Sequence, residues 1–311
     1  MKNFTKGIWN LDDLVSNPTR QTFDKKIKDI RRQSERFAKN KSQLKVNISS
    51  RKFLQLLHEI EDITEKASMI GGYAGLKFSE DTQSDEATAL LTRISQFGST
   101  VENKMLFFDL WWKKGIDEKN AKRLIKEAGN LADYLRYKRL VAKYALTEPE
   151  EKIINTLDVT GISALVKVYD KITNAFTYTV NFNGKKKTMG REELTTLVRN
   201  KNPKIRETAY KSLLTKYQDN KGVIGQIYQN IVLNWKNEGI DMRGFANPIS
   251  VQNISNDVND ETIKVMLNVC KKNAPVFQKY FKQKAKRVGV KKLRRYDLYA
   301  PSKKSGNEKN Y

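Results

Sequence analysis

Histidine and cysteine are almost absent from this sequence, which contains one of each, His58 and Cys270. Catalytic zinc sites need several protein ligands, usually including two or three imidazoles or thiolates. A chain with one imidazole and one thiolate therefore cannot build an ordinary catalytic zinc site. The single cysteine also excludes an intramolecular disulfide framework and any structural zinc site made of cysteines.

Long apolar runs are missing as well. Even the run from Met105 to Trp112 is cut short by Lys113 and Lys114, whereas a membrane-spanning helix needs roughly 18 or more apolar residues. Nothing at the amino terminus resembles a signal peptide. We expect a soluble, cytoplasmic protein with no membrane partner.

Acidic residues are few relative to basic ones. The 311 residues include 35 Asp and Glu against 59 Lys and Arg, which gives a formal net charge of +24. Such an excess is compatible with a polyanionic partner such as nucleic acid, with a chain that is part of a larger protein, or with a lysine-rich proteome. Charge alone does not choose among these three explanations.

The sequence does contain a strong helical pattern. Apolar residues recur every three or four positions over most of the chain, which predicts a mainly α fold. We expect a first helix from Asn17 and Pro18, and a second from a cap at Ser49 to about Gly71 and Gly72. Further helices are expected over residues 85–112, 117–144, 147–160, 162–174 and 191–198, from 202 onward, over 221–237, and over 260–288 with an interruption at Pro275.

Two local signals are sharper than the general pattern. Thr147 and Glu150 are spaced as a capping box, in which each side chain satisfies a backbone N–H at the start of a helix. Over residues 176–189 the apolar period changes to two, around a turn signal at Asn183 and Gly184. The sequence therefore predicts one β-hairpin within a helical protein.

His58 and Cys270 are the first candidates for chemistry. His58 lies at the edge of an apolar helix stripe, and no recognisable serine or cysteine nucleophile motif surrounds it. We interpret it as a flanking helix residue rather than a general base. Cys270 lies among the apolar residues Val265, Met266, Leu267 and Val269 and is interpreted as a small core residue rather than a nucleophile.

Two groups of carboxylates could perform acid–base catalysis. They are Glu59, Glu61 and Asp62 on one expected helix, and Glu148, Glu150 and Glu151 at the start of another. We interpret the first group as a solvated helix face. We interpret the second as negative charge that complements a helix dipole.

Glycine residues and a lysine-rich stretch are the remaining candidates for a ligand-binding site. Gly71, Gly72, Gly184 and Gly190 lack the strand-then-helix setting of a phosphate-binding loop, so no nucleotide site is expected. The stretch from Lys279 to Arg295 contains no acid and includes two aromatic residues, so it could neutralise phosphates and stack on bases. A solvated lysine-rich helix explains it as well, and nucleic acid is kept only as an alternative partner.

The two aromatic residues of that basic stretch are Tyr280 and Phe281. Lys185 to Lys187, beside the expected hairpin turn, are interpreted as loop charges. We assign no catalytic, cofactor-binding or metal-binding residue to this sequence.

Several segments occur in the order typical of the oligoendopeptidase F branch of the thimet-type peptidases, and over almost its whole length the chain resembles that family. The segments are Trp9, Leu11 and Leu14; Gly72 to Ala74 with Asp81 and Thr82; Phe107 to Trp111; Thr147 to Ile153; Thr160 and Gly161; Leu165, Tyr169 and Asp170; Arg206, Ala209 and Tyr210; Ile227 to Trp235; Arg243 and Asn253; and Lys284 to Pro301. The last segment is the sharpest match.

The resemblance implies a largely helical, two-lobed enzyme that encloses a channel and hydrolyses short peptides with a zinc-activated water. In that family two histidines of a His-Glu-x-x-His helix and a downstream glutamate hold the zinc, and the motif glutamate is the general base. All of these would follow the position matched by Pro301. None is transferred to a residue of this sequence.

The resemblance also implies a domain organisation. We expect an amino-terminal helical region over 1–112, a helical domain with the hairpin over 113–200, the start of a truncated catalytic domain over 201–301, and a polar linker over 302–311. The chain would then be a truncated or split amino-terminal portion, with the catalytic half encoded separately as one explanation.

Three functions are carried forward. The first is the channel and substrate-binding lobe of a zinc oligopeptidase, with oligopeptide substrates and zinc in the full-length family, but with no metal and no activity in this chain alone. The second is a basic helical protein that binds nucleic acid. The third is a helical protein that holds peptides or oligomerises without catalysis.

Overall fold

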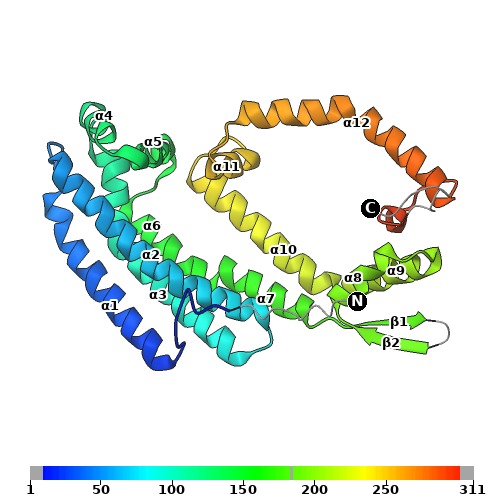
Figure 1. The fold of residues 1–311 in the computed structure, drawn as a ribbon. Coiled ribbons are helices and arrows are strands. Elements are labelled where there is room, and N and C mark those ends of the chain that lie inside the picture. Colours follow the sequence, from blue (N-terminus) through cyan, green and yellow to red (C-terminus); the bar gives the residue numbers. More distant parts are fainter. Residues whose placement is uncertain (1–9, 183–184, 302–311) are drawn as a thin grey trace. The chain divides into compact units, whose positions relative to one another are not determined.

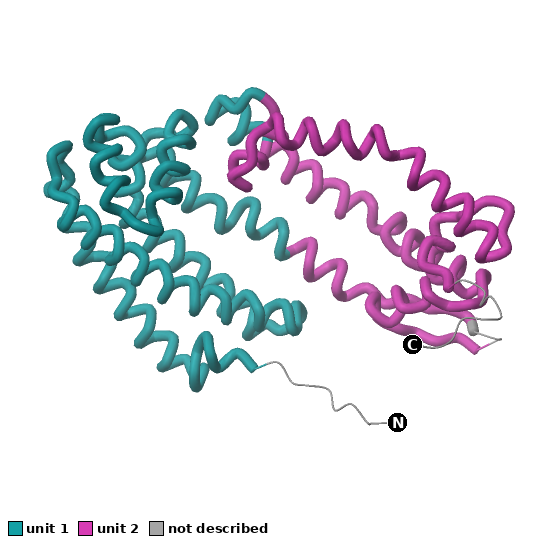
Figure 2. The backbone as a smooth tube through the Cα atoms, turned by 45° about the horizontal axis from the view of Figure 1, so that its top comes forward, with its two compact units in different colours: residues 1–167, 236–246 teal, residues 168–235, 247–311 magenta. Residues whose placement is uncertain are grey.

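The computed structural model describes residues 10–182 and 185–301. It is 78% helical and, in the described residues, contains one two-stranded antiparallel hairpin, which confirms the predicted mainly α fold. The lead at Trp9, the turn at Asn183 and Gly184, and the polar tail 302–311 lie outside the described residues. The chain divides into two compact units (Figure 2), residues 1–167 with 236–246 and residues 168–235 with 247–311.

Four long helices build most of unit 1 (Figure 1). They are α1 (Arg20–Ala38), α2 (Ser50–Glu80), α3 (Asp85–Leu110) and α6 (Glu148–Thr160). α3 packs against α1, α2 and α6. Its apolar face carries the aromatic centre of the core, where the Phe108 ring stacks on Phe53 at 5.9 Å between centroids. Phe53 in turn lies 5.1 Å from Trp112, which is 1% exposed and donates its indole N–H to the Leu135 carbonyl at 3.0 Å.

The first helix begins later than the sequence predicts. Thr19, with extended backbone, is the N-cap of α1, and its hydroxyl accepts the Thr22 N–H at 3.2 Å. Asn17 instead adopts a left-handed conformation with φ 48°, and its carbonyl accepts the Thr22 hydroxyl at 2.8 Å. The predicted start at Asn17 and Pro18 was wrong because the side-chain oxygen that reaches the first turn belongs to Thr19.

The second helix ends later than the sequence predicts. Ser49 caps α2 as predicted, with its hydroxyl accepting the Lys52 N–H at 3.3 Å. The predicted end at Gly71 and Gly72 was wrong, since α2 continues to Glu80. The buried stripe includes Ile70 just before the glycines and continues beyond them through Tyr73, Ala74 and Phe78. Burial of that stripe outweighs the roughly 1 kcal/mol by which each glycine disfavours a helix.

The helix predicted over 117–144 is broken. It consists of α4 (Glu118–Lys126), a 3₁₀ turn (Gly129–Leu131), α5 (Ala132–Leu140) and a second 3₁₀ turn (Val141–Tyr144). Gly129 has φ 55°, a left-handed conformation that interrupts the α-helix. The three-and-four spacing of apolar residues continues across this break, so periodicity alone could not locate it.

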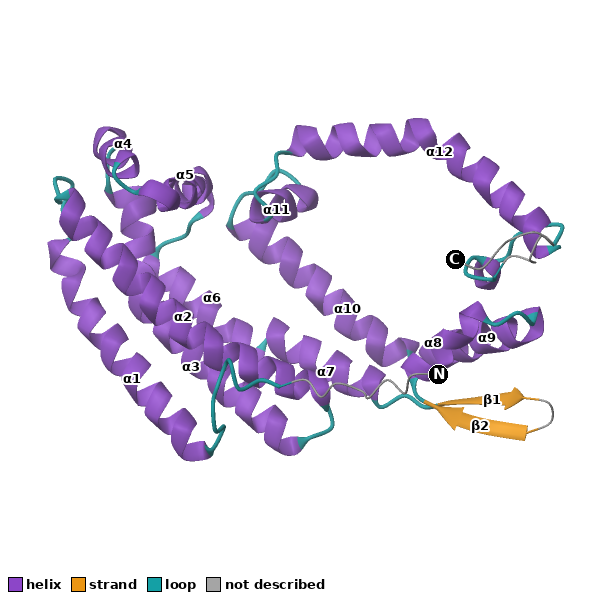
Figure 3. Ribbon diagram, in the orientation of Figure 1, coloured by secondary structure: helices purple, strands orange, loops and turns teal. Residues whose placement is uncertain are grey.

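Unit 2 is built on the predicted hairpin. β1 (Tyr178–Phe182) pairs with β2 (Lys185–Met189), with Tyr178 opposite Met189. α7 (Ile162–Asn174) leads into it, and α8 (Arg191–Thr196) and α9 (Pro203–Asp219) follow it (Figure 3). The hairpin and α9 share a small core made of Phe176, Tyr178, Val180, Met189, Leu194 and Ala209.

The remaining α-helices of unit 2 bury few of their side chains. They are α10 (Lys221–Trp235), α11 (Pro248–Ser255) and α12 (Asp260–Val288). α11 was not predicted, although Asn247 caps it by accepting the Ser250 N–H at 3.1 Å. α12 continues through Pro275 as one helix that is visibly bent in Figure 1, and it ends at Gly289 with φ 79°.

Candidate functional site

The two candidates for isolated chemistry both lie at the surface. His58 on α2 is exposed, and its Nδ1 lies 2.7 Å from Glu61 Oε2, a location typical of a flanking helix residue. Cys270 on α12 is exposed too, so its interpretation as a core residue was wrong. The apolar neighbours that suggested a core, such as Met266 and Leu267, are themselves about half exposed at 50% and 54%.

The donor set does not fit a catalytic zinc ion. Among residues 10–182 and 185–301, no group of three or more His, Cys, Asp or Glu side chains is arranged to hold a metal. The whole sequence offers one imidazole, which is exposed and paired with a carboxylate. We therefore assign no zinc-dependent step to residues of this chain.

The capping box predicted at the start of α6 is confirmed. The Thr147 backbone N–H donates to Glu150 Oε2 at 2.8 Å, and the Thr147 hydroxyl donates to the same oxygen at 2.6 Å. These bonds lower the pKa of Glu150. Glu148 binds Lys152 and Lys41 at 2.7 and 2.8 Å, and those hydrogen bonds lower its pKa. The carboxylates of Glu148 and Glu150 therefore stabilise the first turn of α6.

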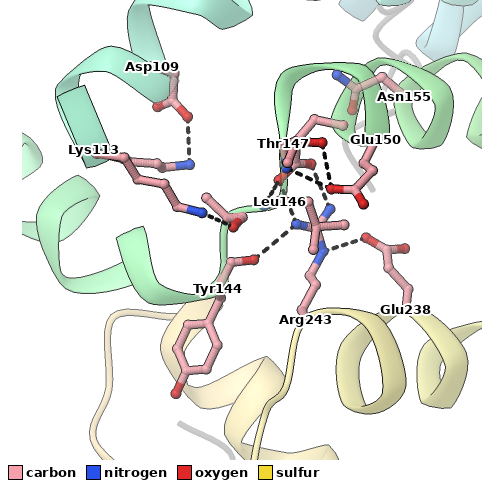
Figure 4. A network of polar contacts seen from close by, with 12 residues as sticks. Asp109, Lys113, Tyr144, Leu146, Thr147, Glu150, Asn155, Glu238 and Arg243 are labelled. Atoms are coloured by element: carbon pink, nitrogen blue, oxygen red, sulfur yellow. Dashed lines mark hydrogen bonds and ion pairs between the residues drawn. The ribbon is translucent and has the colours of Figure 1, made fainter.

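Glu151 has a second role that the sequence did not reveal. It is 8% exposed and forms a two-pronged ion pair with Arg243, with Nη1–Oε1 at 2.8 Å and Nη2–Oε2 at 2.9 Å. The Leu146 N–H also donates to Glu151 Oε1 at 2.9 Å. Arg243 Nε donates to Glu238 Oε1, also at 2.9 Å (Figure 4). Parallel bonds of this kind are among the strongest that proteins form.

Charge and stacking together fix the segment 236–246 within unit 1. Although burial opposes it, hydrogen bonds from Arg243 and the Leu146 N–H hold the pKa of Glu151 below its ordinary value. The Arg243 guanidinium also donates to the Tyr144 carbonyl at 3.3 Å. One ring contact completes the arrangement, because Tyr144 stacks on Phe245 with centroids 3.7 Å apart and planes 7° from parallel.

Unit 2 also has an ion pair between an arginine and a carboxylate, joined by one hydrogen bond and fully buried. Arg206 Nη2 donates to Asp297 Oδ1 at 2.6 Å, and these side chains are 2% and 0% exposed. The other Arg206 nitrogens donate to the carbonyls of Asn200, Lys201 and Tyr296 at 2.8 to 3.1 Å. Every face of this buried guanidinium is therefore matched by an oxygen, as a buried charge requires.

Each unit also carries a hollow that could accept a ligand. Unit 1 has a cavity of about 530 Å³ bordered by α2, α3 and α5. Unit 2 has a more open apolar groove of about 1000 Å³ along α9 and α10, which includes Tyr169, Tyr217 and Tyr228. No described helix of the protein is long and apolar enough to cross a membrane.

Comparison with known proteins gives these features a context. Residues 196–310 match the sequence pattern of peptidase family M3. The chain is similar to an oligoendopeptidase F homolog of Borreliella burgdorferi, with 23% identity over 94% of this chain and 48% of that protein. It is also similar to a plasmid-encoded oligoendopeptidase F of Lactococcus lactis subsp. cremoris, with 21% identity over 85% of this chain and 44% of that protein.

The chain resembles oligoendopeptidase F, and its residues 196–310 match peptidase family M3. It spans about half the length of the curated oligoendopeptidase F relatives that it matches. Among solved structures, oligoendopeptidase-F from Enterococcus faecium has the same fold over 91% of this chain and 56% of that one, with a TM-score of 0.75 and 18% identity.

The structure shows what some of the residues that carry the family resemblance do. Two ion pairs join segments that resemble oligoendopeptidase F. They are the buried pair Arg206–Asp297 and the partly buried pair Arg243–Glu151. Sequence reasoning missed these pairs because 91 and 92 positions separate the partners. Their presence in family-like segments was the signal that could have found them. In this chain, therefore, these four residues stabilise the fold.

Proposed function

We propose that this chain forms the amino-terminal, peptide-binding part of a zinc-dependent oligoendopeptidase, and that it is inactive on its own. One combination of observations carries the proposal. The fold of oligoendopeptidase-F extends over 91% of this chain but this chain covers 56% of that protein, and the sequence here offers a single imidazole. Zinc and the general base would then come from the part of the relatives that this chain does not match.

The proposal includes oligopeptide substrates, a catalytic segment supplied from elsewhere, and a cytoplasmic location. The names of the related proteins support peptide substrates. The lone cysteine supports a reducing compartment, because it leaves no disulfide within the chain.

Activity and zinc content test the proposal that this chain is inactive on its own. The purified chain is mixed with one equivalent of zinc, desalted and analysed for metal, and it is incubated with an internally quenched octapeptide. We expect no stoichiometric zinc and no hydrolysis above the blank, while oligoendopeptidase-F from Enterococcus faecium serves as the positive control. Cleavage by this chain alone that a chelator abolishes would overturn the proposal.

A binding measurement tests the proposal that this chain contributes a peptide-binding surface. A fluorescein-labelled octapeptide is titrated with the chain and followed by anisotropy. We expect saturable binding that unlabelled peptide displaces. A chain that is folded by circular dichroism and shows no binding at millimolar concentration contradicts a peptide-binding role.

A second candidate function rests on α12. Its exposed face pairs Tyr280 and Phe281, which are 52% and 41% exposed with ring centroids 5.5 Å apart, and lysines surround them in the sequence. Exposed aromatics among cations suit a single-stranded nucleic acid. A 20-nucleotide DNA titrated at 50 and 200 mM salt tests this function, since phosphate contacts predict a steep loss of affinity with salt. The absence of binding at 50 mM would remove it.

A further inference from the structure

The cavity of unit 1 has the size and lining of a small-molecule site. Its volume of about 530 Å³ lies within the range of roughly 300 to 1,000 Å³ found for ligand pockets. Residues of α2, α3 and α5 and the turn after α3 line it. The apolar lining includes Leu57, Ile60, Met105, Phe108, Trp112 and Leu135.

One end of the cavity has charges that satisfy each other. Asp109 accepts Lys138 Nζ at 2.9 Å and Lys113 Nζ at 2.5 Å. Lys138 also lies 5.4 Å from the centre of the Tyr134 ring. Burial would raise the pKa of Asp109, but the two lysines hold it below its ordinary value. This end is therefore occupied by its own ion pairs.

Glu102 is the charged lining residue without such a partner. It lies seven residues before Asp109 on α3, which places both on one helix face about 10 Å apart. No hydrogen bond or ion pair within the described part of the chain reaches its carboxylate. The Glu102 residue is accessible to solvent, yet partial desolvation of its carboxylate raises its pKa, against a smaller opposing effect of Lys138.

The distance between the two ends suits a short peptide. An extended chain advances about 3.3 to 3.6 Å per residue, so about 10 Å accommodates two to three residues. The apolar walls would accept one side chain, and the carboxylate of Glu102 would face its neighbour. At physiological ionic strength charges are screened beyond roughly 8 Å, so this carboxylate decides the local preference despite the net charge of +24.

We propose that this cavity binds peptides in which an apolar side chain is next to a cationic one, with the cation paired to Glu102. The inference rests on the proposed function for the peptide nature of the ligand. The inference adds a preference for peptides in which a basic residue directly precedes or follows an apolar one. It also assigns Glu102 as the residue that selects the positive charge.

Gly98 provides a way to close the cavity without unfolding the protein. It lines the cavity in the middle of α3, and a Cβ built there meets nothing within 4 Å. A leucine at this position would occupy the open space. It would also favour the helix, because glycine is among the poorest helix formers.

Three blocked dipeptides test the proposal by calorimetry. They are N-acetyl-phenylalanyl-arginine amide and its analogues with citrulline or glutamate in place of arginine, so shape is nearly constant between the first two while charge changes. We expect the arginine peptide to bind about three- to tenfold more tightly than the citrulline peptide, the range for one charge-assisted pair at an accessible site. The glutamate peptide should bind most weakly.

Two variants and one control complete the experiment. Glu102→Gln should make the arginine and citrulline peptides bind equally, Gly98→Leu should weaken all three, and Glu127→Gln, at an exposed position away from the cavity, should change nothing. Equal binding of all three peptides to the unmodified chain, or a preference for arginine that survives Glu102→Gln, overturns this inference alone. A folded chain that binds the octapeptide but none of the dipeptides also overturns this inference alone, whereas a folded chain that binds neither overturns the peptide-binding function as well.

Discussion

Arg206 donates a 2.6 Å hydrogen bond to Asp297 across 91 positions of the chain, and both side chains are buried. Asp297 also accepts Arg294 Nε at 2.7 Å. Although burial opposes it, these arginines hold the pKa of Asp297 below its ordinary value. One carboxylate thus joins the start of α9 to the last described turn of unit 2, Arg295–Asp297.

Replacing that carboxylate should loosen unit 2. Asp297→Asn leaves the buried Arg206 without its counter-charge, and breaking a buried pair in this way typically costs about 3–5 kcal/mol. We expect faster hydrogen exchange at the backbone amides of α9 and a lower midpoint in urea. Glu193→Gln, which removes an exposed partner of Lys187, is the matched control and should change neither measurement. Unchanged exchange in the Asn variant would contradict a stabilising role for the pair.

The ion pair of unit 1 predicts a specific pH dependence. The pKa of Glu151 is lower in the folded protein than in the unfolded chain, so its stabilisation is present at neutral pH and is lost as pH falls through the lowered value. Glu151→Gln should reduce the free energy of unfolding by about 2–4 kcal/mol at pH 7. The difference from the unmodified chain should shrink as pH falls below the ordinary glutamate pKa of about 4.3 and towards the lowered pKa of Glu151. Urea titrations of the variant and the unmodified chain at pH 7 and pH 3.5 measure the difference in the free energy of unfolding at each pH. A difference that is larger at pH 3.5 would contradict a stabilising role for ionised Glu151.

A buried hydroxyl in unit 2 predicts a gain in stability. The Tyr178 Oη atom is buried and, within the described residues, has no hydrogen-bond partner. Removing an unsatisfied polar atom while keeping the ring should raise the free energy of unfolding by about 0.5–1.5 kcal/mol. Urea denaturation of Tyr178→Phe tests this. A clear loss of stability would show that the hydroxyl is satisfied in solution.

Two glycines should respond to alanine in opposite ways. Gly71 lies inside α2 with open space around its Cβ position, so Gly71→Ala should stabilise unit 1 by about 0.5–1 kcal/mol. Gly129 also has open space but φ 55°, so Gly129→Ala should destabilise it by about 1 kcal/mol through backbone strain. Thermal unfolding of the two variants side by side provides the measurement. Shifts of the same sign would contradict the contrast.

The sequence predicted those features that depend on near neighbours. The caps at Ser49 and Thr147 and the hairpin over 176–189 each follow from residues a few positions apart, and all three are confirmed. It failed where tertiary packing overrides local preference, as in α2, where glycines lie on a helix that a buried stripe holds together. The exposed Cys270 shows the opposite failure, because an apolar sequence does not ensure that anything covers it.

The candidate sites were harder to predict from the sequence than the fold. The ion pairs of Arg206 and Arg243 join positions about 90 residues apart, and no spacing rule connects them. The cavity beside Glu102 is formed by three helices whose packing the sequence pattern does not specify. By contrast, the resemblance to oligoendopeptidase F identified the family from segments that the M3 pattern and the related proteins then supported.

The division of unit 1 into residues 1–167 and 236–246 has a consequence for synthesis. During translation, Glu151 leaves the ribosome long before Arg243, and the whole of 168–235 is made between them. A nascent chain that pauses in this interval holds an otherwise buried carboxylate with no guanidinium to meet it. Unit 1 can therefore complete its folding only after the first stretch of unit 2 has emerged, so pauses in that interval would favour capture of the nascent chain by chaperones or proteases.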